Sequence, residues 1–232
     1  MNRFFAPPAN GEAVLTKEDA HHLLRVLRAK TGDSVEIAWE GRAWRGRISS
    51  SDPCTVTLEE ELPSVESPVS IVLVQALAKG DKMDWIVQKA VELGVTGVIP
   101  VRTRYADVKL NGERAEKKRQ HWQNIAEAAA KQSKRAQIPT ISEVCTLEEA
   151  AALQKDTKMI LLHEKSETPF AIEAVPAVTL FVGPEGGFSD EEAGFLKGQG
   201  AQVMQLGPRI LRTETAGMAA ISILQYEMGD LS

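Results

Sequence analysis

The chain has 232 residues, which suffices for one large domain or two modest ones. With 43% hydrophobic and 25% charged residues, its composition excludes a disordered or fibrous protein and is typical of a soluble globular one. The net charge of −5 gives no overall attraction to nucleic acid. The two cysteines, Cys54 and Cys145, stand in no metal-ligand or disulfide-framework spacing, so we expect no metal site.

Signals for export or membrane insertion are not evident in the sequence. The first residues lack an apolar core of signal-peptide length. No run approaches the roughly 18 apolar residues that a membrane span needs. We therefore expect a cytoplasmic protein that makes no contact with a membrane.

Residues 1–68 are predicted to form a small, mostly β domain. After a helical segment at 21–28, three short runs alternate apolar and polar side chains between turn residues, which predicts a compact barrel or sandwich. These runs are residues 35–39, 43–48 and 55–58. The charged, proline-containing stretch 59–68 is the best candidate for a linker.

Residues 69–232 alternate strand-like and helix-like segments, which predicts an α/β domain with a mainly parallel sheet covered on both faces. Asp81 is placed to cap the first helix, and a long helix is expected from near Gly112 to near Arg135. A helix at 215–228 has no broad polar side, so we expect it to be buried, and we place it at a homodimer interface. The expected strands are residues 69–76, 95–101, 159–162, 178–182 and 202–206.

Positive charge is concentrated between Arg102 and Arg135. This stretch has ten basic and four acidic residues, so the rest of the chain carries an excess of eleven negative charges. A local basic face on an acidic protein can bind a polyanion. A lysine-rich helix face that is simply solvated would give the same pattern.

A glycine-rich loop, GPEGG at residues 183–187, leaves one expected strand and enters a helix that Ser189 can begin as part of an S-x-x-E capping box. Its glycines permit positive φ and close approach of a ligand to the backbone. The loop has neither the lysine of a phosphate-binding loop nor the G-x-G-x-x-G spacing of a dinucleotide site. Glu185 would repel a phosphate, so a cationic or neutral ligand suits it better. A plain connection between strand and helix is the alternative.

A second loop, LGPRILRTETA at residues 206–216, follows the next expected strand. Arg209 and Arg212 beside an apolar segment are costly unless they meet carboxylates, phosphate or a substrate oxygen. Glu214 could be the structural partner of either arginine. Two such turns side by side would form a crevice of exposed backbone groups that can hold a polar small molecule.

These two loops resemble the cofactor-binding motifs of the SPOUT methyltransferases, and more narrowly those of the RsmE family of ribosomal RNA small-subunit uridine-N3 methyltransferases. Other segments are similar to that family in the same order along nearly the whole chain, although Lys134 stands where a glycine is expected. These segments are RFF at 3–5, HHLLRVLR at 21–28, KMDWIVQKAVELG at 82–94 and EAAAKQSKR at 127–135.

The resemblance implies a PUA-like β-barrel at 1–68 and a SPOUT domain at 69–232 whose C-terminal part forms a trefoil knot. It also implies a homodimer that binds S-adenosyl-L-methionine and methylates 16S ribosomal RNA, in the assembled small subunit or as naked RNA. The residues implied to line the cofactor site are Gly183, Glu185, Gly186, Leu206, Gly207, Ile210, Leu211 and Thr213.

For the reaction, the uridine N3 proton must leave and negative charge must spread to the flanking carbonyl oxygens. Arg209 or Arg212 could stabilise that charge as an oxyanion hole does. Glu214 could orient an arginine or accept the proton. The sequence does not separate these roles, and it leaves open a non-catalytic RNA-binding module or a ribose 2′-O methyltransferase.

Five arginines are candidate contacts to RNA phosphates. They are Arg3, Arg25, Arg28, Arg102 and Arg135. His21 and His22 are interpreted as structural or facing RNA rather than as metal ligands. Trp39 and Trp44 could stack on bases, but the barrel core is the favoured interpretation.

Overall fold

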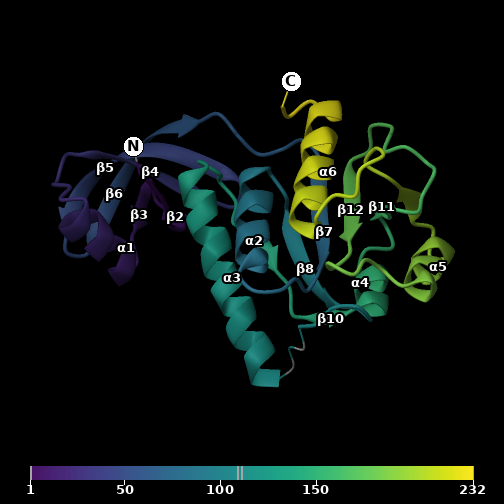
Figure 1. Ribbon diagram of the computed structural model, residues 1–232. Helices are drawn as coiled ribbons and strands as arrows, with labels where there is room; N and C mark the ends of the chain where they lie inside the picture. Colours follow the sequence, from purple (N-terminus) through teal and green to yellow (C-terminus); the bar gives the residue numbers. More distant parts are fainter. Residues whose placement is uncertain (1, 109, 111, 232) are drawn as a thin grey trace. The chain divides into compact units, whose positions relative to one another are not determined.

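The structure is a computed structural model that describes residues 2–108, 110 and 112–231 (Figure 1). By their internal contacts the residues form two compact units. The first ends at Glu66 and also contains Ala130–Ile138, and the second comprises the rest of the chain from Ser67 onward.

The first unit is built on a curled six-stranded sheet with strand order β1-β4-β5-β6-β3-β2. All neighbours pair antiparallel except β1 and β4, which are parallel. Alternate residues of the strands face a core that includes Phe4, Ile37 and Val56, against which Leu23 packs. The elements are β1 (Arg3–Phe5), β2 (Pro8–Ala9), β3 (Glu12–Val14), α1 (Lys17–His21), the π-helix η1 (His22–Val26), β4 (Ser34–Trp39), β5 (Arg42–Ser51) and β6 (Cys54–Leu62).

A segment distant in sequence completes this unit. Glu66 accepts hydrogen bonds from the Arg135 guanidinium at 2.7 Å and from the backbone N–H of Ala136 at 2.7 Å. Lys131 pairs with Asp19 at 2.9 Å, and Gly41 donates its N–H to the Ala136 carbonyl. The end of the long helix and the turn after it therefore belong structurally to the N-terminal β unit.

Lys134 adopts the left-handed backbone conformation, with φ of +64°. It is the position at which the family resemblance leads one to expect a glycine, the residue that accepts this conformation without strain. Its ammonium lies 3.0 Å from Glu36, which also pairs with the buried Arg3 at 3.0 Å, and Arg3 donates to the Lys134 carbonyl. Lys134 thus has a strained backbone and also belongs to a cluster of charged side chains that Arg3, Glu36 and Lys134 form.

The cluster controls the ionisation of Glu36. Burial by itself raises the pKa of the Glu36 carboxyl, but the hydrogen bond and charge of Lys134, with the charge of Arg3, outweigh it and hold that pKa below its ordinary value. A carboxyl whose pKa is depressed on folding stabilises the folded state above its unfolded pKa. This contribution is lost as the pH falls through the lowered folded-state pKa.

The second unit is organised around a parallel sheet with strand order β10-β8-β7-β12-β11-β13, to which β9 is added beside β8. Every pairing within it is parallel, which confirms the predicted mainly parallel sheet. Residues of β7 and β12 are buried on both faces, as their continuous apolar runs predict. The strands are β7 (Ser70–Ala76), β8 (Gly97–Arg102), β9 (Thr140–Ile141), β10 (Cys145–Thr146), β11 (Lys158–Leu162), β12 (Ala177–Val182) and β13 (Gln202–Met204).

Helices cover both faces of this sheet. α6 packs against α2 and β12, whereas α4 lies against β8 and β10, and α5 lies against β13 (Figure 1). Asp81 precedes α2 as predicted, but its side chain makes no capping hydrogen bond. The predicted capping box of Ser189 and Glu192 is present at the start of α5. The helices are α2 (Lys82–Glu92), α3 (Gly112–Gln132), α4 (Leu147–Leu153), α5 (Asp190–Gly198) and α6 (Thr213–Glu227).

The last helix is only partly buried. Its inner side, with Met218, Ile221 and Leu224, lies in the core of the second unit. Ile223 and Tyr226 are 38% and 63% exposed on its other side. The apolar character of this helix is therefore divided between the core and the surface of the chain.

Replacing Lys134 tests the balance of strain and charge. Lys134→Ala keeps the left-handed strain and loses the ion pair with Glu36, whereas Lys134→Gly loses the pair but removes the strain. We expect the alanine variant to be less stable than the glycine variant by about 1 kcal/mol in denaturant unfolding near neutral pH. An alanine variant as stable as the glycine variant would contradict this explanation.

Candidate active site

Three loops meet at the carboxyl ends of adjacent parallel strands. They follow β11, β12 and β13, which are neighbours in the sheet. Together they enclose a cavity of about 420 Å³, and Lys82 and Tyr105, which follow β7 and β8, complete its lining. In an open parallel sheet this edge is where ligands bind. The two loops that the sequence singles out therefore share one cavity.

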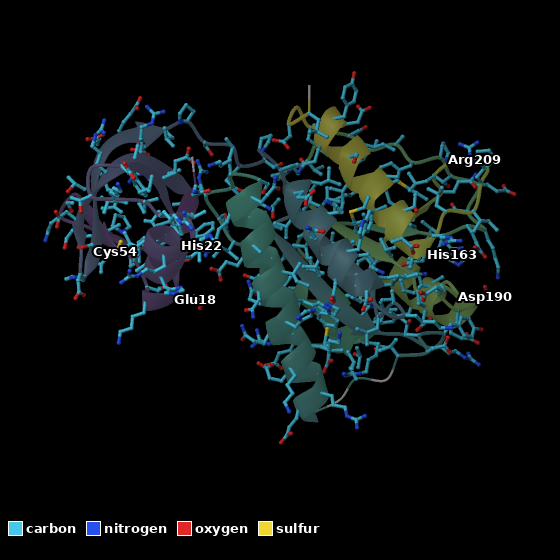
Figure 2. All side chains as sticks on the ribbon, turned by 60° about the vertical axis from the view of Figure 1, so that its left-hand side comes forward. Glu18, His22, Cys54, His163, Asp190 and Arg209 are labelled. Atoms are coloured by element: carbon cyan, nitrogen blue, oxygen red, sulfur yellow. The ribbon has the colours of Figure 1, made fainter. Side chains whose placement is uncertain are left out.

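All eight residues that the resemblance implies for the cofactor site line this cavity. Arg209 and Arg212 line it as well. Glu214 stands in the first turn of α6 and contacts the cavity residue Lys82. In Figure 2 Arg209 and His163, which also lines the cavity, lie at the same end of the second unit.

Two separate constraints explain why glycines occupy the first loop. Gly187 has φ of +71° and donates its N–H to the Pro184 carbonyl at 3.0 Å, which closes a tight turn. A Cβ atom at Gly186 would lie 2.9 Å from the Cβ of Tyr105, so a side chain there would displace the cavity wall. The loop is therefore shaped to keep its backbone close to the cavity.

A buried polar chain holds the loops in register. The Thr213 hydroxyl donates to the Gly183 carbonyl at 2.6 Å and accepts from Gln75 Nε2 at 2.9 Å. Gln75 is fully buried and also donates to the Ala76 carbonyl. These bonds join the ends of β7 and β12 to the start of α6. Sequence reasoning missed Gln75, although a glutamine in an otherwise apolar strand signals a buried hydrogen bond.

Three charged side chains from separate elements meet beside the cavity. Lys82 Nζ lies 2.9 Å from Glu185 Oε1 and 3.4 Å from Glu214 Oε2. The backbone N–H of Lys79 also donates to Glu185 Oε1 at 3.2 Å. The contact of 3.4 Å between Lys82 and Glu214 is an ion pair without a hydrogen bond. Glu214 Oε2 is buried and makes no hydrogen bond among the described residues.

The cluster shifts the ionisation of two members in opposite directions. The hydrogen bond to Glu185 raises the pKa of the Lys82 ammonium, although partial burial opposes it. Burial raises the pKa of Glu185, but its hydrogen bonds with Lys82 and with backbone N–H groups outweigh burial and hold that pKa below its ordinary value. At neutral pH both groups are therefore charged.

Sequence reasoning missed Lys82 as a site residue. It is the first residue of α2, where the partial positive charge of a helix N-terminus disfavours a cation. That unfavourable position was the available signal. Sequence reasoning also missed His163. This residue lines the cavity, and its Nδ1 accepts a hydrogen bond from the Lys165 N–H.

Glu214 does not take the role of structural partner to an arginine. Its ion pair is with Lys82, and neither Arg209 nor Arg212 forms an ion pair among the described residues. Both arginine side chains belong to exposed residues on the loop after β13. The site therefore carries two cationic groups that are not engaged with a carboxylate of the described chain.

The candidate RNA contacts divide into two groups. Arg25 and Arg28 are exposed on and just after η1, and Arg102 in the second unit is exposed while donating to the Val144 carbonyl at 2.9 Å. Arg3 and Arg135 are only 6% and 4% exposed and are paired with Glu36 and Glu66. The structure does not favour these two as phosphate contacts, because their guanidinium groups are occupied by the partly buried carboxylates of Glu36 and Glu66.

The segment around η1 carries a strained backbone and exposed side chains. His21, His22 and Arg25 are exposed, Val26 is 58% exposed, and Arg28 has φ of +57°. π-Helical turns and positive φ at a non-glycine residue often mark functional segments. Figure 2 shows His22 and Glu18 on this helical segment.

The favoured core interpretation of the two tryptophans is wrong. Trp39 is 37% exposed, and Trp44 is only half-buried. The Arg42 guanidinium lies over the Trp44 ring at 5.1 Å, in cation–π contact.

Two kinds of feature are absent from the described residues. Residues 2–108, 110 and 112–231 contain no helix that is long and apolar enough to span a bilayer. Within the same ranges no group of three or more His, Cys, Asp or Glu side chains is arranged to hold a metal ion.

Comparison with known proteins gives matches over nearly the whole chain. Residues 65–225 match a family described as RNA methyltransferase domain, and residues 15–61 match one described as RNA methyltransferase PUA domain. Ribosomal RNA small subunit methyltransferase E of Bacillus subtilis (strain 168) is 32% identical over 228 residues, covering 92% of this chain and 89% of the relative. The protein of the same name from Buchnera aphidicola subsp. Schizaphis graminum is 34% identical, covering 94% and 92%.

Solved structures agree with these matches. The crystal structure of a ribosomal RNA small subunit methyltransferase E from Neisseria gonorrhoeae, bound to S-adenosyl methionine, has a TM-score of 0.88 and 33% identity to this chain. The alignment covers 100% of both chains. Both the β unit and the parallel-sheet unit therefore have counterparts in that structure.

The buried Thr213 hydroxyl can be tested by a matched pair of variants. Thr213→Val removes the hydroxyl at nearly constant volume, so the Gly183 carbonyl loses this donor and one N–H of the Gln75 amide loses its acceptor. We expect it to lower the free energy of unfolding by about 1–3 kcal/mol, measured by denaturant titration. Thr213→Ser retains the hydroxyl and should lower the free energy of unfolding clearly less. Equal decreases in both variants would contradict the role of this hydrogen bond.

Proposed function

The chain belongs to the RNA methyltransferase family described by these matches, and on that premise we propose that it transfers a methyl group from S-adenosylmethionine to N3 of a uridine in 16S ribosomal RNA. The observation that carries the proposal is the cavity formed by the loops after β11, β12 and β13. Its relatives are named ribosomal RNA small subunit methyltransferases, and the structure from Neisseria gonorrhoeae holds S-adenosyl methionine.

The residues of the cavity fit this methyl donor. A volume of about 420 Å³ is within the range of small-molecule sites. Glu185 lines the cavity as a carboxylate paired with Lys82, and a carboxylate at this place favours a sulfonium over an anionic ligand. Ile210 and Leu211 supply apolar surface for the adenine. When bound, the donor supplies an electrophilic methyl group, whose bond to sulfur breaks as its electron pair returns to the sulfur.

The chain's own residues must prepare the nucleophile. We assign Glu214 as the acceptor of the N3 proton, because it is a carboxylate in the first turn of α6 that contacts the cavity residue Lys82. The electron pair of the broken N–H bond remains on N3 and forms the bond to the methyl carbon. Arg209 and Arg212 are cations at the same cavity, and either can stabilise the negative charge on a flanking carbonyl oxygen.

The remaining predictions form part of the same proposal. The first unit would bind RNA in the assembled small subunit through the exposed residues of η1, and the enzyme would act in the cytoplasm. The exposed Ile223 and Tyr226 of α6 support a homodimer. The return of the chain from β13 at the sheet edge to α6, which packs against α2 and β12, supports a trefoil knot.

Methyl transfer tests the function directly. Purified protein is incubated with labelled S-adenosylmethionine and either small subunits or naked 16S RNA, and the nucleosides are analysed by mass spectrometry. We expect 3-methyluridine. A ribose-methylated product, or no transfer to either substrate, would refute the assignment.

Variants separate the roles within the site. Glu214→Gln keeps the size of the side chain but cannot accept the proton, so we expect methyl transfer to fall by about 10²-fold or more while calorimetry still detects donor binding. Arg209→Ala and Arg212→Ala are compared with Glu214→Gln. We expect kcat to fall by about 10²-fold in the variant that lacks the arginine stabilising the oxyanion. Full activity in all three variants would eliminate the proposed catalytic residues.

The RNA contact has a matched control within the first unit. Arg25→Ala should weaken RNA binding and reduce the salt dependence of the binding constant by about one phosphate contact. Arg45→Ala removes an exposed arginine that is paired with Glu60 at 2.6 Å and should have little effect. Equal losses in both variants would show that only overall charge matters.

A further inference from the structure

Tyr105 presents a half-exposed aromatic ring at the wall of the cavity. It lies in the loop after β8 and is 48% exposed. A Cβ atom at Gly186 would lie 2.9 Å from the Cβ of Tyr105, so the two loops approach this closely only because Gly186 has no side chain. A large ring gains free energy when its faces are removed from water. The exposed part of this ring therefore offers a surface on which a planar ligand can be buried.

The loop that carries this ring is anchored on both sides of it. The Arg104 backbone N–H donates to Glu192 Oε1 at 2.8 Å, and the Arg104 guanidinium donates to Glu191 at 3.0 Å. The first turn of α5 therefore holds the residue that precedes the ring. Asp107, two residues after the ring, pairs with Lys79. A loop that is already ordered loses less conformational entropy on binding than a flexible one, so the ring is positioned before a ligand arrives.

A positive charge lies beside the ring. The Cζ atom of Arg104 is 5.8 Å from the centroid of the Tyr105 ring, within the range of a cation–π contact. Arg104 and its partner Glu191 are both largely exposed, so their ion pair is solvated and weak, and an RNA phosphate can compete for the guanidinium. Proteins bind single-stranded RNA with this combination of groups, because bases stack on aromatic rings while cations meet the backbone.

The order of strands separates this ring from the apolar residues assigned to the donor. In the row β8-β7-β12-β11-β13, the strand before Tyr105 stands at one end, and the strand before Ile210 and Leu211 stands at the other. Ile210 and Leu211 supply the apolar surface for the adenine of the donor. The ring contributed from the other end of the row is therefore available to a second base, which is that of the RNA substrate.

We propose that Tyr105 is a substrate-binding residue whose ring stacks on the uracil that is methylated. This inference rests on the proposed function. Stacking covers a face of the uracil and leaves its edge open, so N3 can meet the methyl donor and the flanking carbonyl oxygens can meet Arg209 or Arg212. Tyr105 itself takes no part in the proton transfer. It holds the plane of the base in one orientation, which is the condition for in-line attack by N3.

The test compares Tyr105→Leu and Tyr105→Phe with the parent protein. Donor Kd is measured by calorimetry, stability by denaturant unfolding, and kcat and KM by methyl transfer to small subunits. Leucine keeps an apolar side chain but cannot stack, so we expect methyl transfer to fall by about 10- to 100-fold, the range of one base–aromatic stack. Because phosphate contacts elsewhere supply most RNA affinity, the loss should appear mainly in kcat. Phenylalanine keeps the ring and should stay within about threefold of the parent.

We expect donor Kd within about threefold of the parent, and unchanged stability, in both variants. An unchanged kcat in Tyr105→Leu, or equal losses in the two variants, would overturn the stacking role and leave the methyltransferase intact. A loss of activity that matches a loss of donor binding would assign the ring to the donor adenine, and one that matches a loss of stability would make it structural. Either would overturn the inference. A parent that methylates neither subunits nor naked RNA would overturn the proposed function itself.

Discussion

The parallel pairing of β12, β11 and β13 is the constraint from which the site follows. Parallel neighbours end at the same edge of a sheet, so the loops that leave these strands must converge there. Leu161 is paired with both Phe181 and Val203, which places the ends of all three strands at one level. The residues of the sheet interior thus position loops that are separated by about twenty residues each in sequence.

Polar groups then determine how these loops fit together. The Gln75–Thr213–Gly183 chain is buried, so breaking it leaves unpaired groups away from water, which is more costly than losing a surface contact. The Lys82 cluster is partly exposed, so its contribution to stability is smaller. Its importance is that it joins the start of α2 to the loop after β12 and to the first turn of α6.

The sequence predicts much of this arrangement because the relevant signals are local. Continuous apolar runs predict the buried parallel strands, and the glycine-rich turn and the capping box at Ser189 predict the loop and helix after β12. Gln75 and Lys82 escaped prediction as site residues because their partners Thr213 and Glu185 lie 138 and 103 positions away. No local pattern reports such a pairing.

Long-range partners also explain where charge was misinterpreted. Arg3 and Arg135 contribute to the positive charge of the chain, but Glu36 and Glu66 neutralise them inside the first unit. A count of charges along the sequence cannot distinguish such residues from the exposed Arg25. The same limitation applies to Ala130–Ile138, which begin with the last residues of α3, a helix that otherwise lies in the second unit, and yet belong to the first.

The central claim is that the loops after β11, β12 and β13 form a site for a sulfonium methyl donor. Calorimetric titration of the intact protein with S-adenosylmethionine tests it most directly. We predict saturable binding in the micromolar range, abolished when the cavity is narrowed by Gly186→Leu, which would collide with Tyr105. The absence of binding at millimolar donor, or unchanged binding by a folded Gly186→Leu variant, would contradict it.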